Sequence, residues 1–326
     1  VRNMGVWTMP RYDRNYISRR ARELGFVRDT LEKVIRLADI LQMLNTNPIL
    51  KNSLALKGGT AINLTIFDLP RLSVDIDLDY LFNNSREEML LQRGRIRDII
   101  DRYMLAEGYT LNQKSKAAHS LDSWVYDYTG VSGNRDNIKI EINYSLRAHL
   151  FPAEERPVMT AELAGDYQVK TLSVVEIYAG KINALFNRAA VRDLYDVHQM
   201  MITGLFDAGE YSLLRKAVVF YAAITAREAG SRFQLAGMDA ISHRQVKTDL
   251  LPVLRSTDRF DLEDARQAVR NFVAELMVLT AEEQRFLEVF RQGSYQPDLL
   301  FEDEDILQRI QHHPMALWKT RNMKKE

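Results

Sequence analysis

The chain has 326 residues, of which 46% are hydrophobic and 27% are charged, and its formal net charge is zero. This composition is typical of a globular protein long enough for two domains, and the balanced charge disfavours a uniform polyanion-binding surface. The absence of cysteine excludes disulfides, thiolate metal sites and cysteine nucleophiles, and the spacing of the six histidines disfavours a zinc enzyme. Because no apolar run approaches about 18 residues, we expect a cytoplasmic protein with no membrane contact.

The N-terminal part of the chain is predicted to begin with helices. Residues 1–20 are basic and aromatic, which favours an extension packed on the surface over an arm that contacts nucleic acid. Residues 22–45 carry apolar side chains at helical spacing and end in turn residues, which predicts one amphipathic helix. A second, short helix is expected over residues 60–67, with Thr60 as its cap.

The next part of the chain is typical of strands. Residues 73–80 alternate strictly between apolar side chains and Ser73, Asp75, Asp77 and Asp79, which predicts a strand with one buried face and one wet face. A helix rich in arginine and glutamate follows over residues 84–107. Further strands are expected at 109–111, 123–128 and 137–144, with a hairpin turn at 131–134, and one short strand within 152–169.

From residue 173 onwards the pattern is helical. Helices are predicted at 173–187, 191–203, 211–229, 245–254, 262–278 and 281–291, followed by a tail with a basic end at 319–325. This change predicts an α+β fold of two domains. Residues 1–170 would form an α/β domain with a small mixed sheet and a helical N-terminal extension, and residues 171–326 an all-helical domain.

Asp75 and Asp77 are candidates for a metal site. Two residues apart on a strand, their carboxylates project from one face, roughly 6–7 Å apart. Like charges this close repel each other unless a cation lies between them, and oxygen ligands suit Mg²⁺ or Mn²⁺, which also bind phosphate oxygens. Such ions activate an attacking hydroxyl and stabilise a leaving pyrophosphate. Asp79 is one step further along the strand and ranks lower.

A glycine pair precedes this strand. Gly58 and Gly59 lack Cβ atoms, so their backbone N–H groups can approach phosphate oxygens, with a helix N-terminus behind them and the Thr60 hydroxyl beside them. A glycine pair alone is often a turn, and alternating aspartates alone are often a solvated strand face. Their order as loop, helix and acidic strand is more specific, and it predicts a phosphate-binding loop beside a metal pair.

A later segment adds charged residues to a helical pattern. Lys181 lies among apolar residues of its predicted helix and can reach a triphosphate as a compact charge. Asp193 and Asp196 are three residues apart and therefore share a helix face near Arg192. The alternative is a surface helix of mixed charge.

The order of these motifs resembles the nucleotidyltransferase superfamily, whose members join a GG or GS loop and helix to a strand that carries DxD. The finer resemblance is to the AbiEii/AbiGii toxin family of bacterial abortive-infection and toxin–antitoxin systems. The similar segments are spread over most of the length of the chain: LKGGTAINL (56–64), RLSVDIDLDY (71–80), KIEIN (139–143), EIYAGKINALFNRAAVRDLYDVHQM (176–200), FRQGSYQPDLLF (290–301) and HHPMALWK (312–319).

The resemblance implies roles for the residues of the first two segments. The loop that holds nucleotide phosphates matches Gly58, Gly59 and Thr60; the R-x-S lead-in matches Arg71 and Ser73; and the metal-binding pair matches Asp75 and Asp77. Glu141 is the positional candidate for a third carboxylate on a neighbouring strand, where the superfamily usually has aspartate. A plain surface pair of Glu141 with Lys139 is equally compatible with the pattern.

The resemblance also matches Lys181 to the family's motif lysine and the run that contains Asp193 and Asp196 to its acidic motif. One of these aspartates would contact the nucleotide or orient Lys181, and the other would pair with an arginine. Their spacing does not decide which.

The activity implied by the family is a metal-dependent transfer of nucleotides from an NTP to RNA, with the 3′ end of tRNA as the acceptor, which stops translation. The implied cofactor is Mg²⁺ or Mn²⁺, and the implied partner is a cognate antitoxin. Two alternatives remain. The first is nucleotidylation of a protein or a small molecule at the same site, and the second is a non-catalytic module that binds nucleotide or a partner.

Overall fold

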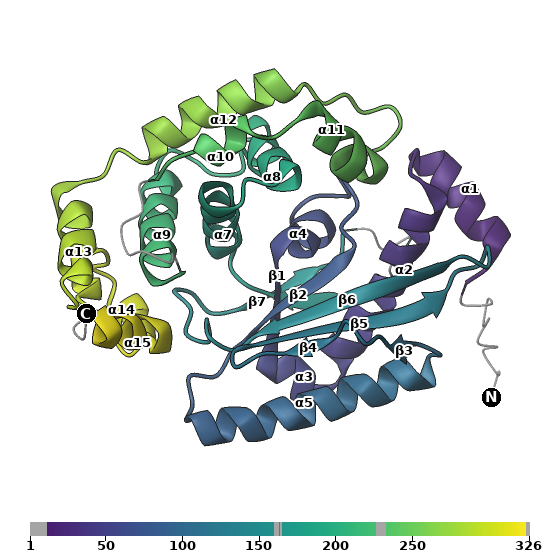
Figure 1. The fold of residues 1–326 in the computed structure, drawn as a ribbon, viewed down its shortest axis with the longest axis horizontal. Helices are drawn as coiled ribbons and strands as arrows, with labels where there is room; N and C mark the ends of the chain where they lie inside the picture. The colour runs from purple at the N-terminus through teal and green to yellow at the C-terminus, as the bar shows by residue number, and fades with distance from the viewer. Residues whose placement is uncertain (1–11, 160–162, 164, 226–232, 324–326) are drawn as a thin grey trace, which may run out of the picture.

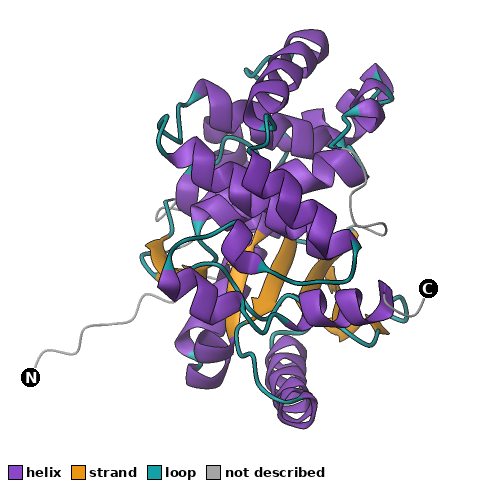
Figure 2. Cartoon of the chain, turned by 90° about the vertical axis from the view of Figure 1, so that its left-hand side faces the viewer, coloured by secondary structure: helices purple, strands orange, loops and turns teal. Residues whose placement is uncertain are grey.

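The computed structural model describes residues 12–159, 163, 165–225 and 233–323. In the view of Figure 1, helix α5 lies on one side of a central sheet, and helices α7 to α9 and α12 lie on the other. Figure 2, turned by 90°, shows the strands at the centre with helices above and below them. Part of the predicted N-terminal extension, the end of the helix at 211–229 and the last residues of the basic tail lie outside the described residues.

The sheet of the described residues has eight strands, in the order β3-β5-β6-β2-β1-β8-β7, with β4 paired to β5. Strands β2 and β6 are parallel, as are β1 and β8, whereas β1 and β2 are antiparallel. The prediction of a mixed sheet is therefore confirmed. The strands are β1 Leu54–Lys57, β2 Asp75–Tyr80, β3 Thr110–Leu111, β4 Lys116–Ala117, β5 Leu121–Thr129, β6 Arg135–Asn143, β7 Glu154–Pro157 and β8 Gln168–Thr171.

The sheet holds more strands than the sequence pattern predicts. Strand β1 was missed because its three apolar residues and one lysine are too few to show an alternation, and because a helix and a glycine pair flank them. The long strands follow the predicted pattern. On β6 the side chains of Ile138, Ile140 and Ile142 are fully buried, whereas Lys139 and Glu141 between them are partly exposed.

The helices of the sheet-bearing part are α1 Arg14–Leu24, α2 Arg28–Thr46, α3 Pro48–Ser53, α4 Gly58–Ala61 and α5 Arg86–Ala106, with the π-helical turn η1 Ile62–Ile66 after α4. The helix predicted over 22–45 is present as α2, but its predicted start is wrong, because α2 begins only at Arg28. Gly25 adopts φ 75°, and this left-handed residue ends α1 before α2 begins. Thr60 is also not a cap, since the helix already begins at Gly58.

The described residues after β8 are helical. The helices are α7 Val174–Asn187, α8 Val191–Ile202, α9 Glu210–Thr225, α10 Ala236–Asp239, α11 His243–Gln245, η2 Val246–Leu250, η3 Leu251–Val253, α12 Leu262–Leu276, α13 Ala281–Arg291, η4 Pro297–Leu299, α14 Glu304–Ile310 and α15 Pro314–Met323. We call residues 174–323 the helical half. No described helix is long and apolar enough to cross a membrane.

The prediction of a tail after residue 291 is wrong, because α14 and α15 fold back onto the helical half. Lys319 of α15 is buried, and its Nζ donates a hydrogen bond to the Ala223 carbonyl oxygen of α9 at 2.7 Å. Burial lowers the pKa of Lys319 to about 8. The residue therefore serves packing between α9 and α15 rather than a solvated basic end.

Candidate active site

Strand β2 lies between β1 and β6 and places its aspartates between residues of both neighbours. Asp77 is opposite Lys57 of β1 on one side and opposite Glu141 of β6 on the other. Asp75 is opposite Lys139 of β6. The parallel pairing of β2 with β6 therefore brings Glu141 beside the DxD pair, on the neighbouring strand that the family resemblance implies.

The glycine pair is in direct contact with site residues. Gly58 adopts φ 68°, and a Cβ at this position would lie 2.7 Å from Asp77 Oδ2. At Gly59 a Cβ would lie 2.6 Å from Arg71 Nη2 and 3.0 Å from Ser73 Oγ. A side chain at either position would displace the groups around it, and side chains rarely adopt the positive φ of Gly58. The predicted loop is the first turn of α4, which follows β1 directly. We keep the name glycine loop for Gly58 and Gly59, which pack against the acidic strand and the residues before it.

Thr60 joins the helix to the start of β2. Its hydroxyl donates to the Asp75 carbonyl oxygen at 2.5 Å and lies 2.9 Å from Ser73 Oγ. The side chain is fully buried, so its hydroxyl is already used within the protein. Thr60 therefore positions Asp75, whereas its predicted contact with nucleotide phosphate stays a prediction.

A cluster of five charges lies across the site from the DxD pair. Lys181 of α7 places its Nζ 3.0 Å from Asp193 Oδ1 and 2.8 Å from Asp196 Oδ2, both on α8. Arg71 binds both carboxylate oxygens of Asp196 at 2.7 Å, and Arg188 Nε lies 2.8 Å from Asp193 Oδ2. We call these five residues the charge cluster. Three cations and two anions give it a net charge of one positive unit.

Both aspartates of the charge cluster have the same pair of functions. Each carboxylate contacts Lys181, and each also pairs with an arginine. The sequence left open which aspartate orients Lys181 and which pairs with an arginine, and in the structure both aspartates do both. Asp193 and Asp196 are each only 1% exposed and Arg71 is 2% exposed, so little of their surface is open, although Arg71 and Asp193 border the charged cavity. A direct nucleotide contact of Arg71 stays a prediction.

The charge cluster keeps its members ionised. Burial lowers the pKa of Lys181, but the charges of Asp196 and Asp193 outweigh it and hold this pKa above its ordinary value. Burial raises the pKa of Asp196, but Arg71 and Lys181 outweigh it and hold this pKa below its ordinary value. Lys181 therefore carries a fixed positive charge at neutral pH.

The DxD pair lacks such compensation. No described residue donates a hydrogen bond to the carboxylate of Asp75 or Asp77. Burial raises the pKa of Asp77; Lys57 opposes this shift, whereas Asp75 and Glu141 add to it. The ionised form of Asp77 is thus held in an unfavourable place, and a bound cation would relieve it.

The donor set fits Mg²⁺ or Mn²⁺ through two carboxylates. Among the described residues, no group of three or more histidine, aspartate or glutamate side chains is arranged to hold a metal ion. Glu141 Oε1 instead lies 2.9 Å from Lys139 Nζ. Mg²⁺ commonly takes one or two protein carboxylates and completes its shell with water and phosphate, so Asp75 and Asp77 suffice. Glu141 as a third ligand stays a prediction.

Asp79 does not share the exposed face expected for the whole row. It is 2% exposed, and its Oδ1 lies 2.5 Å from Lys57 Nζ. The charge of Asp79 is thus neutralised by Lys57, in agreement with its lower rank as a candidate metal ligand. Lys57 itself was missed by sequence reasoning, although its place next to the glycine pair at the end of a short apolar run was a usable signal.

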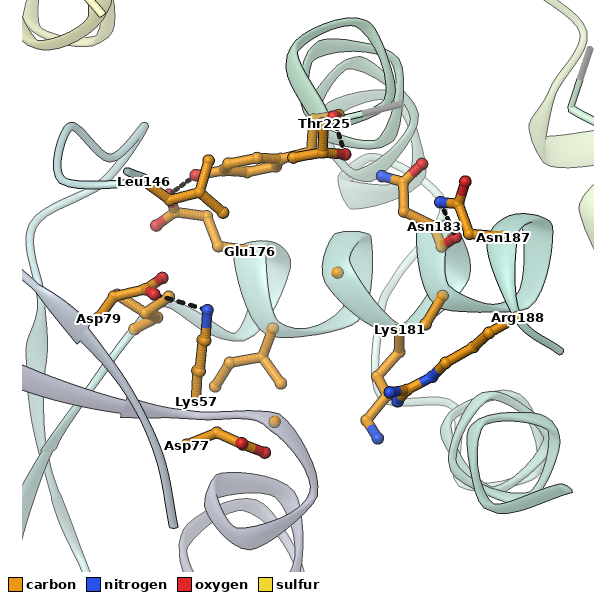
Figure 3. A pocket seen from close by; sticks show the side chains of 16 residues that line it. Lys57, Asp77, Asp79, Leu146, Glu176, Lys181, Asn183, Asn187, Arg188 and Thr225 are labelled. Carbon is orange, nitrogen blue, oxygen red and sulfur yellow. Dashed lines mark hydrogen bonds and ion pairs between the residues drawn. The ribbon is translucent and has the colours of Figure 1, made fainter. Parts of the chain in front are cut away.

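Two cavities adjoin the DxD pair. The first, about 320 Å³, lies against α7 and has an apolar wall; we call it the apolar cavity (Figure 3). The second, about 370 Å³, lies against β6 and α8 and is lined mainly by charged residues; we call it the charged cavity. Asp77, Lys181 and Arg188 line both cavities, so the reactive groups of two bound molecules can meet there.

A glycine loop packed on a DxD strand, faced by a lysine from a helical half, defines a nucleotidyltransferase. The family model described as "Nucleotidyl transferase AbiEii toxin, Type IV TA system" matches residues 39–292. The chain belongs to this family, and it is a nucleotidyltransferase toxin of a toxin–antitoxin system.

Comparison with solved structures shows the same fold. MenT4, a nucleotidyltransferase toxin from Mycobacterium tuberculosis H37Rv, superimposes with a TM-score of 0.63 at 18% sequence identity. The match covers 92% of this chain and 99% of MenT4. No curated protein matches the sequence.

Removing one anion of the charge cluster is expected to destabilise the protein strongly. Asp196→Ala leaves Arg71 and Lys181 buried without their shared partner, so we expect the free energy of unfolding to fall by about 3–5 kcal/mol. Urea denaturation followed by circular dichroism measures this. Glu155→Ala, which removes the exposed ion pair with Lys51, is the control and should cost less than about 1 kcal/mol. Equal effects of the two variants would contradict a structural role for the charge cluster.

Neutralising Asp77 is expected to preserve or raise stability without metal. The raised pKa of Asp77 means that the folded state favours the protonated form of this side chain. Protonated Asp77 therefore stabilises the fold at low pH, and this stabilisation is lost as the pH rises through the pKa of Asp77 in the folded protein. Asp77→Asn should therefore melt at or above the wild-type temperature at pH 7, and the difference should vanish below about pH 4. Asp79→Asn, which weakens the ion pair with Lys57, should melt lower. A lower melting temperature for Asp77→Asn than for Asp79→Asn would refute this assignment.

Proposed function

We propose that the protein transfers nucleotides from an NTP to an RNA acceptor in a metal-dependent reaction, that this acceptor is the 3′ end of tRNA, and that translation stops as a result. The observation that carries the proposal is the unpartnered pair Asp75 and Asp77, in contact with the glycine loop and facing Lys181. The family description, which names a nucleotidyl transferase toxin, supports the reaction class. The choice of tRNA rests on the resemblance to the family.

In the proposed reaction, the acceptor hydroxyl attacks the α-phosphorus of the NTP. A new P–O bond forms to the acceptor oxygen while its O–H bond breaks and the proton passes to water. The bond from the α-phosphorus to its bridging oxygen breaks, and pyrophosphate leaves with that electron pair. A divalent cation held by Asp75 and Asp77 would supply charge neutralisation for the phosphate oxygens. Such chemistry depends mainly on positioning and on electrostatic stabilisation.

The fixed charges of the protein suit this reaction. Lys181 borders both cavities beside Asp77, and its two aspartates hold it in place and charged. Arg188 also borders both cavities, and its side chain is 67% exposed, so it can reach a substrate phosphate. A cation that is already oriented needs no rearrangement when negative charge develops, which is why such preorganised groups accelerate phosphoryl chemistry.

The charged cavity suits the acceptor. Its wall carries Lys139 and Arg192 beside the carboxylates, and these cations can contact the phosphates of an RNA strand. Because the net charge of the chain is zero, such contacts would be local rather than spread over the surface. The partner expected from the family is a cognate antitoxin.

Transfer is tested with an NTP labelled at the α-phosphate, incubated with separate pools of RNA and of protein. We expect label on RNA, dependent on Mg²⁺ or Mn²⁺ and abolished by a chelator. Asp75→Asn and Asp77→Asn should each reduce the rate by roughly 10³-fold, because each removes a ligand of the ion that neutralises the phosphates. Glu155→Gln, a change on an exposed ion pair, should leave the rate within twofold.

The same experiment decides between the alternatives. Label on protein alone would replace the RNA acceptor by a protein hydroxyl. Full activity of Asp77→Asn would remove the enzymatic account of this site. Binding of the ion is measured independently by the shift in melting temperature on adding Mg²⁺. This shift should be larger for the wild type than for Asp77→Asn, because a ligand stabilises the state that binds it.

A further inference from the structure

We propose that the apolar cavity holds the nucleoside of the NTP, that Gly180 keeps this cavity open for it, and that Asn183 selects among bases. The inference rests on the proposed function, because it assigns one part of that site. It divides the two cavities between the two substrates: the NTP enters on the side of β1 and α7, and the acceptor on the side of β6 and α8.

The linings of the two cavities differ in the way that this division requires. The apolar cavity has Leu146, Leu172, Ile177 and Ala184 in its wall, which suit the flat faces of a base. Its volume of about 320 Å³ lies at the lower end of the range for small-molecule sites. The charged cavity offers lysines and arginines that suit a backbone of phosphates, beside the carboxylates of Asp75 and Asp77 that would hold the metal ion.

The ends of the apolar cavity suit the rest of the nucleotide. Lys57, Gly58 and Asp77 border it, so a triphosphate that leaves the cavity would arrive at the glycine loop and the DxD pair. Figure 3 shows Lys57 and Asp77 on the side of α7 to which Lys181 points. Asn183 extends from the opposite edge of the same helix. The face of α7 between these edges is the wall of the cavity.

Gly180 lies on this wall, in the interior of α7. A Cβ built on it meets no atom within 4 Å, and its φ is not positive, so neither the fold nor the backbone conformation requires glycine here. Glycine inside a helix is destabilising relative to almost any other residue. The open space in front of Gly180 belongs to the apolar cavity. The lack of a side chain at Gly180 therefore leaves this part of the cavity empty.

Asn183 supplies a polar atom that the folded protein leaves without a partner. The residue is 5% exposed and lines the apolar cavity, and its Oδ1 has no hydrogen-bond partner among the described residues. Its Nδ2 donates to the Val218 carbonyl oxygen at 3.1 Å. This bond fixes the orientation of the amide, because the reversed amide would place two acceptors against each other. Asn183 therefore offers an acceptor, whose complement is an amino or imino N–H of a base.

The test measures equilibrium binding of each of the four NTPs, and of inorganic triphosphate, to the full chain by calorimetry with Mg²⁺ and without acceptor. The variant is Gly180→Leu, and its matched control is Gly94→Leu, at a glycine inside α5 whose Cβ would also meet nothing within 4 Å. Both variants should melt at or above the wild-type temperature, because leucine favours helix. We expect Gly180→Leu to weaken the tightest NTP at least tenfold while inorganic triphosphate changes less than twofold. Gly94→Leu should change neither.

Binding of all NTPs by Gly180→Leu with wild-type affinity would overturn the assignment of the apolar cavity, and transfer activity that persists would leave the proposed function intact. Failure of the wild type to bind any NTP would overturn both. Asn183→Ala tests base selection separately. The ratio of dissociation constants between the weakest and the tightest NTP should fall at least fivefold, and an unchanged ratio would refute the role of Asn183.

Discussion

The bidentate ion pair between Arg71 and Asp196 holds the two halves of the active site together. Arg71 lies in the segment before the acidic strand, and Asp196 lies on α8 of the helical half, 125 residues later. Both are almost fully buried, and Asp196 also binds Lys181. Buried charges are tolerated only when each has its partners, so the five residues of the charge cluster depend on one another. The position of Lys181 beside Asp77 follows from this dependence.

The two sets of charges in the site are arranged in opposite ways. Every carboxylate of the charge cluster has at least two cationic partners, which gives Lys181 a fixed place and a fixed charge. Asp75 and Asp77 have no hydrogen-bond donor among the described side chains, and burial disfavours the charge of Asp77. Functional sites often keep such unfavourable groups because a substrate or an ion completes them. The charge cluster, whose carboxylates are all paired, therefore holds Lys181 in place beside the unpaired carboxylates of Asp75 and Asp77.

The sheet topology explains why two substrates can meet at Asp77. Strand β2 has β1 on one side and β6 on the other, so the glycine loop after β1 and Glu141 of β6 approach the same aspartate from opposite directions. The helical half covers this side of the sheet (Figure 1), and α7 lines the apolar cavity whereas the start of α8 lines the charged one. One central strand thus separates an apolar cavity from a charged one.

The sequence by itself determined the elements that depend on local pattern. Alternation along β2 and β6 placed Asp75, Asp77 and Glu141, and the order of glycine pair, helix and DxD strand indicated the class of enzyme, because both signals need only neighbouring residues. Tertiary structure alone decided which groups pair: Thr60 with the Asp75 carbonyl oxygen, Asp79 with Lys57, Arg71 with Asp196, and Lys319 with α9. These partners lie 15 to 125 residues apart, as in Thr60–Asp75 and Arg71–Asp196. Neither Thr60 nor these charged residues carry a local sign of their partners, so only the fold shows which aspartates pair with cations and which have no hydrogen-bond donor among the described residues.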